Sequence, residues 1–326
     1  CLRAKVQRLA TSDKIKASTN MELKSMENQI NVGIIGAGAM GLLYAANFAD
    51  KSKLTLFTHR KEQADLLNQK GISLIDNDTT KNIHIHAAQI TEEEQLTKQQ
   101  LLIIAVKQYS LNEIIPILQQ LPIKIPILFI QNGAGHLERL SELGPKRTIL
   151  LGISEHGAGR EDDTTVIWRG HGRTKYSIYQ GELNDDLTEL LTTSPTFPIE
   201  KHADYQAIIQ EKLFINAVIN PLTAVLGVQN GKLLENQEWH RLLIRVVNEI
   251  ETVLPIENAL EKVETICRTT ALNFSSMALD CMNERMTEID GIVLPILEKG
   301  DQTGTSLPTL RTLYQIIKGL EGERHV

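Results

Sequence analysis

Three polar residues, Lys212, Asn216 and Asn220, stand at intervals of four in the otherwise apolar segment 212–224. Residues four apart share one face of a helix, and a helix that is apolar on nearly all sides is buried. Burying an amide or an ammonium group without a partner costs on the order of several kcal/mol, so this polar stripe needs partners. A polar ligand and a hydrogen-bond network between helices are the two alternatives.

Lysine at this place suits acid chemistry. Partial burial lowers the pKa of a lysine towards neutrality, so that the ammonium group can donate a proton or stabilise a developing alkoxide. Reduction of a carbonyl by hydride needs such a donor. Asn230, which Gly231 follows, adds another amide at an expected helix end.

Ser276 and Glu288 form a second constellation of polar residues. One continuous helix would place them about 18 Å apart, which is too far for both to hold one small substrate. Thr287 and Asp290 have the spacing of an N-cap and an acidic N3 residue, so a new helix is predicted to begin there and Ser276 can fold back beside Glu288. The alternative is that Glu288 is an ordinary first-turn carboxylate, favoured by the helix dipole.

Gly36, Gly38 and Gly41 have the spacing G-x-G-x-x-G between a predicted strand over 30–35 and a predicted helix over 42–50. The first glycine allows a tight turn, the second lets a pyrophosphate approach the backbone, and the third lets helix and strand pack closely. The helix N-terminus then offers N–H groups to the phosphates. The alternative is a glycine-rich turn without a ligand.

The end of the next predicted strand, 53–58, distinguishes between nicotinamide cofactors. NAD-binding domains usually carry Asp or Glu about 20 residues beyond the glycines, on the ribose hydroxyls. Here the chain reads Thr58-His59-Arg60-Lys61, without a carboxylate. Arg and Lys suit a 2′-phosphate, so NADP(H) is favoured over NAD(H). The alternative is that Arg60 starts a solvated helix.

The elements that position these residues fall into two groups. Strands are predicted over 30–35, 53–58, 101–106, 126–130, 148–153, 165–168 and 176–179, a half-exposed hairpin over 72–75 and 83–86, and helices over 42–50, 61–69 and 111–120. After about residue 199 only helices are predicted, over 205–225, 238–253, 259–270 and the C-terminal part. Strands alternating with helices and then helices alone predict an α/β fold, with a parallel-sheet domain over 29–199 and an all-α domain over 200–326.

Composition excludes several classes of protein. The chain has 326 residues, a net charge of −6 and 4% aromatic residues, which argues against nucleic-acid binding. No apolar run approaches the roughly 18 residues of a membrane span. Cys1, Cys267 and Cys281 are odd in number and lack metal-ligand spacing, so we expect no metal site, no disulfide framework and a reducing compartment such as the cytoplasm.

The first 28 residues differ from the rest. They begin with Cys1, are polar, and show neither sustained apolar periodicity nor the apolar core of a secretory signal. We expect residues 1–28 to be an extension outside the fold, either disordered or derived from cloning, with a native start at Met21 or Met26.

The order of motifs resembles the ketopantoate reductase family: GAGAMG (36–41), Asn132-Gly133, KLFINAVINPLTA (212–224), SSMALD (275–280) and TEID (287–290). The resemblance covers roughly residues 30–320, and the string from Lys212 is far more specific than the glycine motif. It implies a Rossmann-type domain followed by an all-α domain, as in 6-phosphogluconate-dehydrogenase-like folds. It also implies NADPH-dependent reduction of 2-dehydropantoate to (R)-pantoate, on the pantothenate route to coenzyme A.

The resemblance also implies roles for individual residues. Lys212 would be the general acid and Glu288 a second catalytic residue that also touches cofactor. Substrate contacts would fall on Asn132, Asn216, Asn220, Asn230 and Ser276. Cofactor contacts would fall on Gly36, Ala37, Gly38, Ala39, Met40, Gly41, Arg60, Lys107, Asn132 and Glu288.

One stretch departs from the family pattern, and two other functions stay open. After Asp290 the family usually continues with Asn-Gly three or four residues later, whereas here Gly291 follows directly and Pro295 falls in an expected helix. The alternatives are an NADPH-dependent reductase of another small 2-keto acid, and a non-catalytic NADPH-binding regulator. Spare apolar helix faces and the resemblance favour a homodimer; no metal, nucleic-acid or membrane partner is expected.

Overall fold

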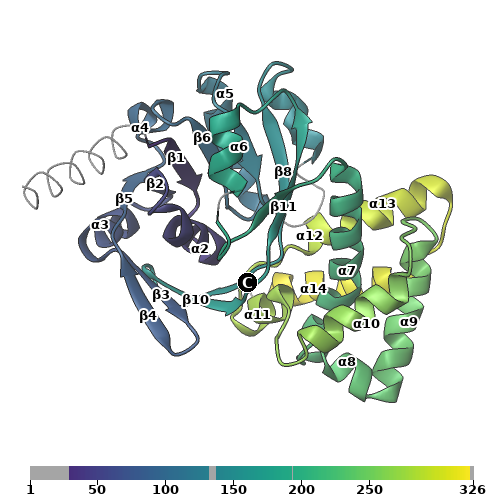
Figure 1. Ribbon diagram of the computed structural model, residues 1–326. Coiled ribbons are helices and arrows are strands. Elements are labelled where there is room, and N and C mark those ends of the chain that lie inside the picture. The colour runs from purple at the N-terminus through teal and green to yellow at the C-terminus, as the bar shows by residue number, and fades with distance from the viewer. Residues whose placement is uncertain (1–28, 132–136, 193, 324–326) are drawn as a thin grey trace, which may run out of the picture. The chain divides into compact units, whose positions relative to one another are not determined.

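The computed structural model describes residues 29–131, 137–192 and 194–323 (Figure 1). They form two compact units that alternate along the chain. Of the described residues, the first unit contains those up to 103 together with 158–169 and 184–191, and the second contains those within 104–157, 170–183 and from 192 onward. The predicted extension, residues 1–28, lies outside the described residues.

The first unit is built from strands alternating with helices. Its elements, wholly or mainly, are β1 (Asn31–Ile35), α2 (Ala39–Phe48), β2 (Lys53–Thr58), α3 (Lys61–Lys70), β3 (Ile72–Asp76), β4 (Thr79–Ile83), β5 (His86–Gln89), α4 (Glu93–Thr97), β6 (Leu101–Ile104), β9 (Gly157–Arg160), β10 (Thr165–Gly170) and α6 (Asp185–Thr192). Four strands lie in the order β6-β1-β2-β5, and β2 pairs in parallel with both β1 and β5. A smaller sheet has the order β4-β3-β10-β9.

The predicted hairpin exists, but its second strand was placed wrongly. β3 pairs with β4, which covers 79–83 rather than 83–86, and β5 instead joins β2 in the larger sheet. The reason is the turn at Asn77, whose φ of 50° permits a tight reversal directly after Asp76. β4 is exposed along most of its length, so it lacks the apolar alternation used to place it.

The second unit begins with strands and ends with helices. Its elements are η1 (Gln108–Ser110), α5 (Leu111–Gln120), β7 (Ile127–Phe129), η2 (Leu137–Leu143), β8 (Ile149–Ser154), β11 (Thr174–Gln180), β12 (Ile199–Lys201), α7 (Tyr205–Leu226), α8 (Lys232–Glu235), α9 (Gln237–Glu251), α10 (Ala259–Thr269), α11 (Ser276–Met282), α12 (Ile289–Ile292), α13 (Leu294–Thr303) and α14 (Pro308–Glu323). Beyond β12 the described residues contain helices and no strand. The predicted α/β class, with a parallel-strand sheet before a helical region, is confirmed.

Helix α7 carries the predicted polar stripe and lies at the centre of the helical region. Asp204 caps its start, since the carboxylate accepts hydrogen bonds from the backbone N–H groups of Gln206 and Ala207. Gly227, in the left-handed conformation with φ 66°, ends it. Helices α9, α10, α11, α12 and α14 all contact α7, which explains why nearly every side of its second half is apolar and buried.

The segment that departs from the family pattern folds into two short helices. The Thr287 hydroxyl accepts a hydrogen bond from the Ile289 N–H at 3.1 Å, but the N-cap of α12 is Glu288, one residue after the predicted N-cap. Pro295 lies in the first turn of α13, where its missing N–H has no helical partner to lose. The proline therefore starts a helix rather than interrupting one. No helix among the described residues is long and apolar enough to cross a bilayer.

Candidate active site

The glycine turn has the geometry of a phosphate cradle. It joins β1 to α2, and Gly36 has a φ of 106°, which favours glycine. The backbone N–H of Gly36 donates to the carbonyl of Phe57 at 2.9 Å, which ties the turn to β2. A Cβ added to Gly38 would meet nothing within 4 Å, so there is open space above this turn. Gly38 is the N-cap of α2 and has no side chain, and the first turn holds no acidic residue, so the first N–H groups of the helix can donate hydrogen bonds to an anion.

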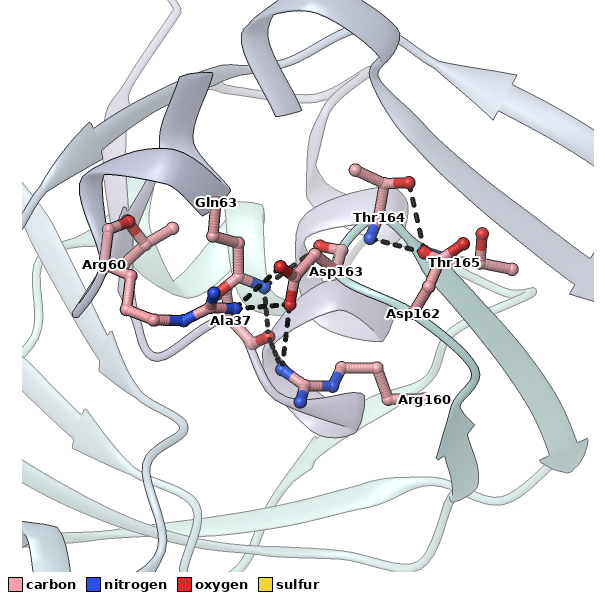
Figure 2. A network of polar contacts seen from close by, with 9 residues as sticks. Ala37, Arg60, Gln63, Arg160, Asp162, Asp163, Thr164 and Thr165 are labelled. Carbon is pink, nitrogen blue, oxygen red and sulfur yellow. Dashed lines mark hydrogen bonds and ion pairs between the residues drawn. The ribbon is translucent and has the colours of Figure 1, made fainter. Parts of the chain in front are cut away.

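Arg60 lies at the start of α3, directly after β2, where a 2′-phosphate was predicted to bind (Figure 2). Its Nη2 lies 2.6 Å and 2.7 Å from the two carboxylate oxygens of Asp163. Arg160 Nη1 lies 3.8 Å from the same carboxylate and donates to the Ala37 carbonyl at 3.4 Å. Gln63 donates to that carbonyl and to the Asp163 carbonyl, both at 3.0 Å. Arg60 is thus the exposed N-cap of α3, as the alternative expected, and it is also paired with Asp163.

The stripe on α7 has the exposure of a ligand-binding face. Asn216 and Asn220 are 8% and 6% exposed, and Lys212 is half-buried. Within the described residues none of the three side chains makes a hydrogen bond or an ion pair. Within the described residues these three side chains therefore take no part in a hydrogen-bond network between helices, although Thr223 of the same helix does bond to Ser275. Their polar atoms are not among the buried ones that lack a partner, so solvent or a ligand can reach them.

Burial lowers the pKa of Lys212, while the nearby carboxylate of Glu155 raises it and the ammonium group of Lys175 lowers it further. Glu155 and Lys175 form their own ion pair at 2.8 Å, so the charges next to Lys212 largely cancel. Desolvation is the dominant cause, and it moves the pKa in the direction that helps an ammonium group to give up its proton. The sequence prediction for this lysine has the same sign.

Lys107 holds together the segment that leads to Glu288. Its Nζ lies 2.6 Å from the carboxylate of Asp280 in α11 and donates to the Met286 carbonyl at 3.4 Å. The next residue, Gln108, directs its backbone N–H at Glu288 Oε1 over 3.5 Å. Residues 276–288 are therefore not one continuous helix, in agreement with the argument from the length of such a helix. The resemblance predicts a cofactor contact for Lys107. In the structure its ammonium group is paired with Asp280.

The remaining predicted residues differ in what they contact. Ser276 is exposed at the start of α11, whereas its neighbour Ser275 caps that helix and accepts a hydrogen bond from the Thr223 hydroxyl of α7 at 2.7 Å. Asn230 is buried and donates to the Thr270 hydroxyl at 2.8 Å, while its Oδ1 has no hydrogen-bond partner among the residues that the structure describes. Asn132 lies outside the described residues.

Two family models match the chain: ketopantoate reductase PanE/ApbA over residues 32–181, and ketopantoate reductase PanE/ApbA C terminal over residues 204–321. The 2-dehydropantoate 2-reductase of Listeria innocua is 96% identical over 301 residues, which are 92% of this chain and 100% of that protein. The chain belongs to the ketopantoate reductase family. This confirms the family predicted from the motifs, and with it an oxidoreductase.

Solved structures agree with this membership of the ketopantoate reductase family. The probable 2-dehydropantoate 2-reductase of Bacillus subtilis is 35% identical with a TM-score of 0.79, and the match covers 90% of this chain and 100% of that one. D-mandelate dehydrogenase with NADH and anilino(oxo)acetate is 22% identical with a TM-score of 0.81, covering 91% and 100%. The latter shows the shared fold. Membership of the family carries use of a nicotinamide cofactor, NAD(P), as its general property.

Several polar residues of the ketopantoate reductase chain were missed by sequence reasoning. Arg160, Asp163 and Asp280 each contact a predicted site residue, from positions 103 to 173 residues away in the chain. Asp163 follows Asp162 in an acidic run, which reads as a solvated surface. One signal was present in the sequence: no Asp or Glu follows the end of β2, where NAD-binding domains usually carry one. In the structure a carboxylate from a distant segment, that of Asp163, lies beside Arg60.

Proposed function

We propose that the protein reduces 2-dehydropantoate to (R)-pantoate with NADPH, in the cytoplasm. The observation that carries this proposal is the stripe of Lys212, Asn216 and Asn220, which is largely buried on α7 and makes no hydrogen bond within the described residues. The polar atoms of these three residues are not among the buried ones that lack a partner in the described chain, so they are free to bind a ligand. A keto acid with a hydroxyl, a carbonyl and a carboxylate offers as many polar groups as the stripe needs.

Hydride comes from the reduced nicotinamide when NADPH is bound. As the keto carbon takes the hydride, the carbonyl oxygen gains negative charge, and Lys212 Nζ transfers a proton to it, so that C=O becomes CH–OH. The lowered pKa of Lys212 favours this transfer. The amides of Asn216 and Asn220 orient the substrate by donating to its oxygens. Glu288 accepts a hydrogen bond from a substrate hydroxyl and, together with Ser276 and Asn230, completes the substrate contacts.

The residues of the first unit fit a dinucleotide phosphate chain. Open space at Gly38 and the uncapped start of α2 would hold the pyrophosphate next to Ala37, Ala39, Met40 and Gly41. Arg60 would hold the 2′-phosphate, because a guanidinium matches phosphate geometry and half of this side chain is exposed. This supports NADPH over NADH. Lys107 and Asn132 complete the proposed cofactor set, as the resemblance implies.

Two other functions remain as alternatives. D-mandelate dehydrogenase shares the fold, so another small 2-keto acid is the nearest alternative substrate. A non-catalytic NADPH-binding regulator would need neither a buried lysine nor the amides of α7.

A homodimer is part of the proposal, and sedimentation at micromolar concentration tests it.

The deciding experiment is NADPH oxidation with 2-dehydropantoate, measured beside pyruvate and branched 2-keto acids. We expect kcat/KM for 2-dehydropantoate to exceed that of the other acids by at least about a hundredfold. A higher kcat/KM for another acid would mean that this acid, and not 2-dehydropantoate, is the substrate. NADPH binding without turnover of any acid would favour the regulator.

A further inference from the structure

The carboxylate of Asp163 occupies the place where the proposed 2′-phosphate subsite needs an anion. It lies within 2.7 Å of Arg60 Nη2 and 3.8 Å from Arg160 Nη1, beside the Ala37 carbonyl in the glycine turn (Figure 2). Two guanidinium groups from separate elements therefore converge on one internal carboxylate. A phosphate monoester has the charge and the acceptor oxygens that such a pair of guanidinium groups binds best.

The ion pair is accessible and replaceable. The side chains of Arg60 and Asp163 are 50% and 26% exposed. Pairs this exposed contribute only about 0–1 kcal/mol, so a ligand anion can displace the carboxylate. Only Nη2 of Arg60 contacts Asp163, and a guanidinium has five N–H donors. The backbone near Asp163 is held independently, since Gln63 donates to its carbonyl and Asp162 accepts from the N–H groups of Thr164 and Thr165.

Asp163 also supplies what the end of β2 lacks. NAD-binding domains place a carboxylate on the ribose hydroxyls from the end of this strand, and here that strand end reads Thr58-His59-Arg60. A carboxylate brought to Arg60 from another segment can accept a hydrogen bond from a 2′-hydroxyl. The same carboxylate repels a 2′-phosphate, because like charges at this separation oppose one another.

We propose that Asp163 is a specificity-determining residue, which competes with the 2′-phosphate of NADPH for Arg60 and Arg160 and so narrows the preference for NADPH over NADH. This inference rests on the proposed use of NADPH. It assigns Arg160 as a second guanidinium for the 2′-phosphate. Asp163, in contrast to the two arginines, weakens binding of the 2′-phosphate, so its removal strengthens binding of the phosphorylated cofactor.

The test is calorimetric binding of two fragments, adenosine 2′,5′-bisphosphate and AMP, to the full-length protein. Asp163→Asn keeps the size of the side chain and removes its charge. We expect it to tighten binding of the bisphosphate by about three- to tenfold and to leave AMP without a gain. Glu161→Gln is the matched control, because Glu161 is exposed, lies two residues before Asp163 and also loses one negative charge. We expect this variant to change the affinity for the bisphosphate by less than about twofold.

A double-mutant cycle separates competition for Arg60 from a general charge effect. In an Arg60→Gln background, the gain from Asp163→Asn should shrink, because the nearer of its two guanidinium partners is gone and only Arg160 remains. Arg160→Gln should weaken binding of the bisphosphate and leave binding of AMP unchanged.

Three results would overturn the assignment of Asp163: no tighter binding of the bisphosphate to Asp163→Asn, an equal gain from Glu161→Gln, or weaker binding, which would mean that Asp163 orients Arg60. If the unchanged protein binds neither fragment, the proposed cofactor use itself is wrong. A thermal melt checks that each variant is folded.

Discussion

Replacing Asn216 by leucine should leave the stability of the protein nearly unchanged and damage its activity. The residue is 8% exposed, within the described residues its amide makes no hydrogen bond, and its amide atoms are not among the buried ones that lack a partner. Water or a ligand can therefore reach the amide, so leucine of similar volume neither breaks a hydrogen bond within the protein nor removes a buried unpaired group. We expect the free energy of unfolding to change by less than about 1 kcal/mol. Because the amide is proposed to hold substrate, kcat/KM for 2-dehydropantoate should fall about a hundredfold.

The matched control lies on the same helix. Thr223 is fully buried, and its hydroxyl contacts the carbonyls of Ile219 and Asn220 at 2.8 Å and 3.2 Å and the Ser275 hydroxyl at 2.7 Å. Thr223→Val removes a satisfied hydroxyl at nearly constant shape, so it should lower the free energy of unfolding by about 1–2 kcal/mol.

Urea unfolding measures the stability of both variants, and NADPH oxidation measures their activity. A loss of stability in Asn216→Leu like that of the control would show that the amide has a structural partner. The reasoning that reserves the stripe for a ligand would then be refuted.

Further predictions concern buried charges. Burial lowers the pKa of Lys51 to about 8, and its Nζ lies 4.0 Å from the centre of the Phe48 ring with no hydrogen bond in the described part of the chain. The unfolded chain therefore binds more protons between pH 8 and 10.5, and stability rises with pH across that window. Lys51→Met should add about 1–3 kcal/mol to the free energy of unfolding at pH 7 and less above pH 8, measured by urea unfolding; an equal gain at all pH values would contradict the assignment. Burial lowers the pKa of His156 to about 4, from 6.5, so stability should be lost as the pH falls from 6.5 to 4, and His156→Phe should reduce that loss; an unchanged acid limb would contradict it. Arg147 is buried and donates to the carbonyls of Leu118 in the last turn of α5 and of Leu121, Pro122 and Ile125 after it, so Arg147→Met should cost about 3–5 kcal/mol in thermal unfolding, and a loss under 1 kcal/mol would refute its structural role.

Local patterns in the sequence predicted local structure well. The strand over 53–58 was placed to the residue, because its apolar run is bounded by polar residues at both ends. The start of α12 was predicted to within one residue of its N-cap, Glu288, since capping depends on neighbours within one helical turn. The stripe on α7 follows from helical spacing alone, and its burial follows from the apolar residues between its members.

Contacts between distant segments could not be read in the same way. Asp163 reaches Arg60 across 103 residues, and Asp280 reaches Lys107 across 173. Nothing in the spacing of those residues encodes the pairing, which depends on how β10 and α11 are positioned. The strand over 83–86 was misplaced because an Asn in the left-handed conformation, rather than apolar alternation, decides where β4 begins.

The most direct test of the account is the effect of Lys212→Ala on NADPH oxidation with 2-dehydropantoate, measured together with the dissociation constant for NADPH. If Lys212 donates the proton, kcat should fall by about 10²–10⁴-fold, while the NADPH dissociation constant changes by less than about twofold. In the unchanged protein, kcat should also decline as the pH rises through the lowered pKa of Lys212. Near-normal turnover of Lys212→Ala would contradict the assignment of this lysine as the acid.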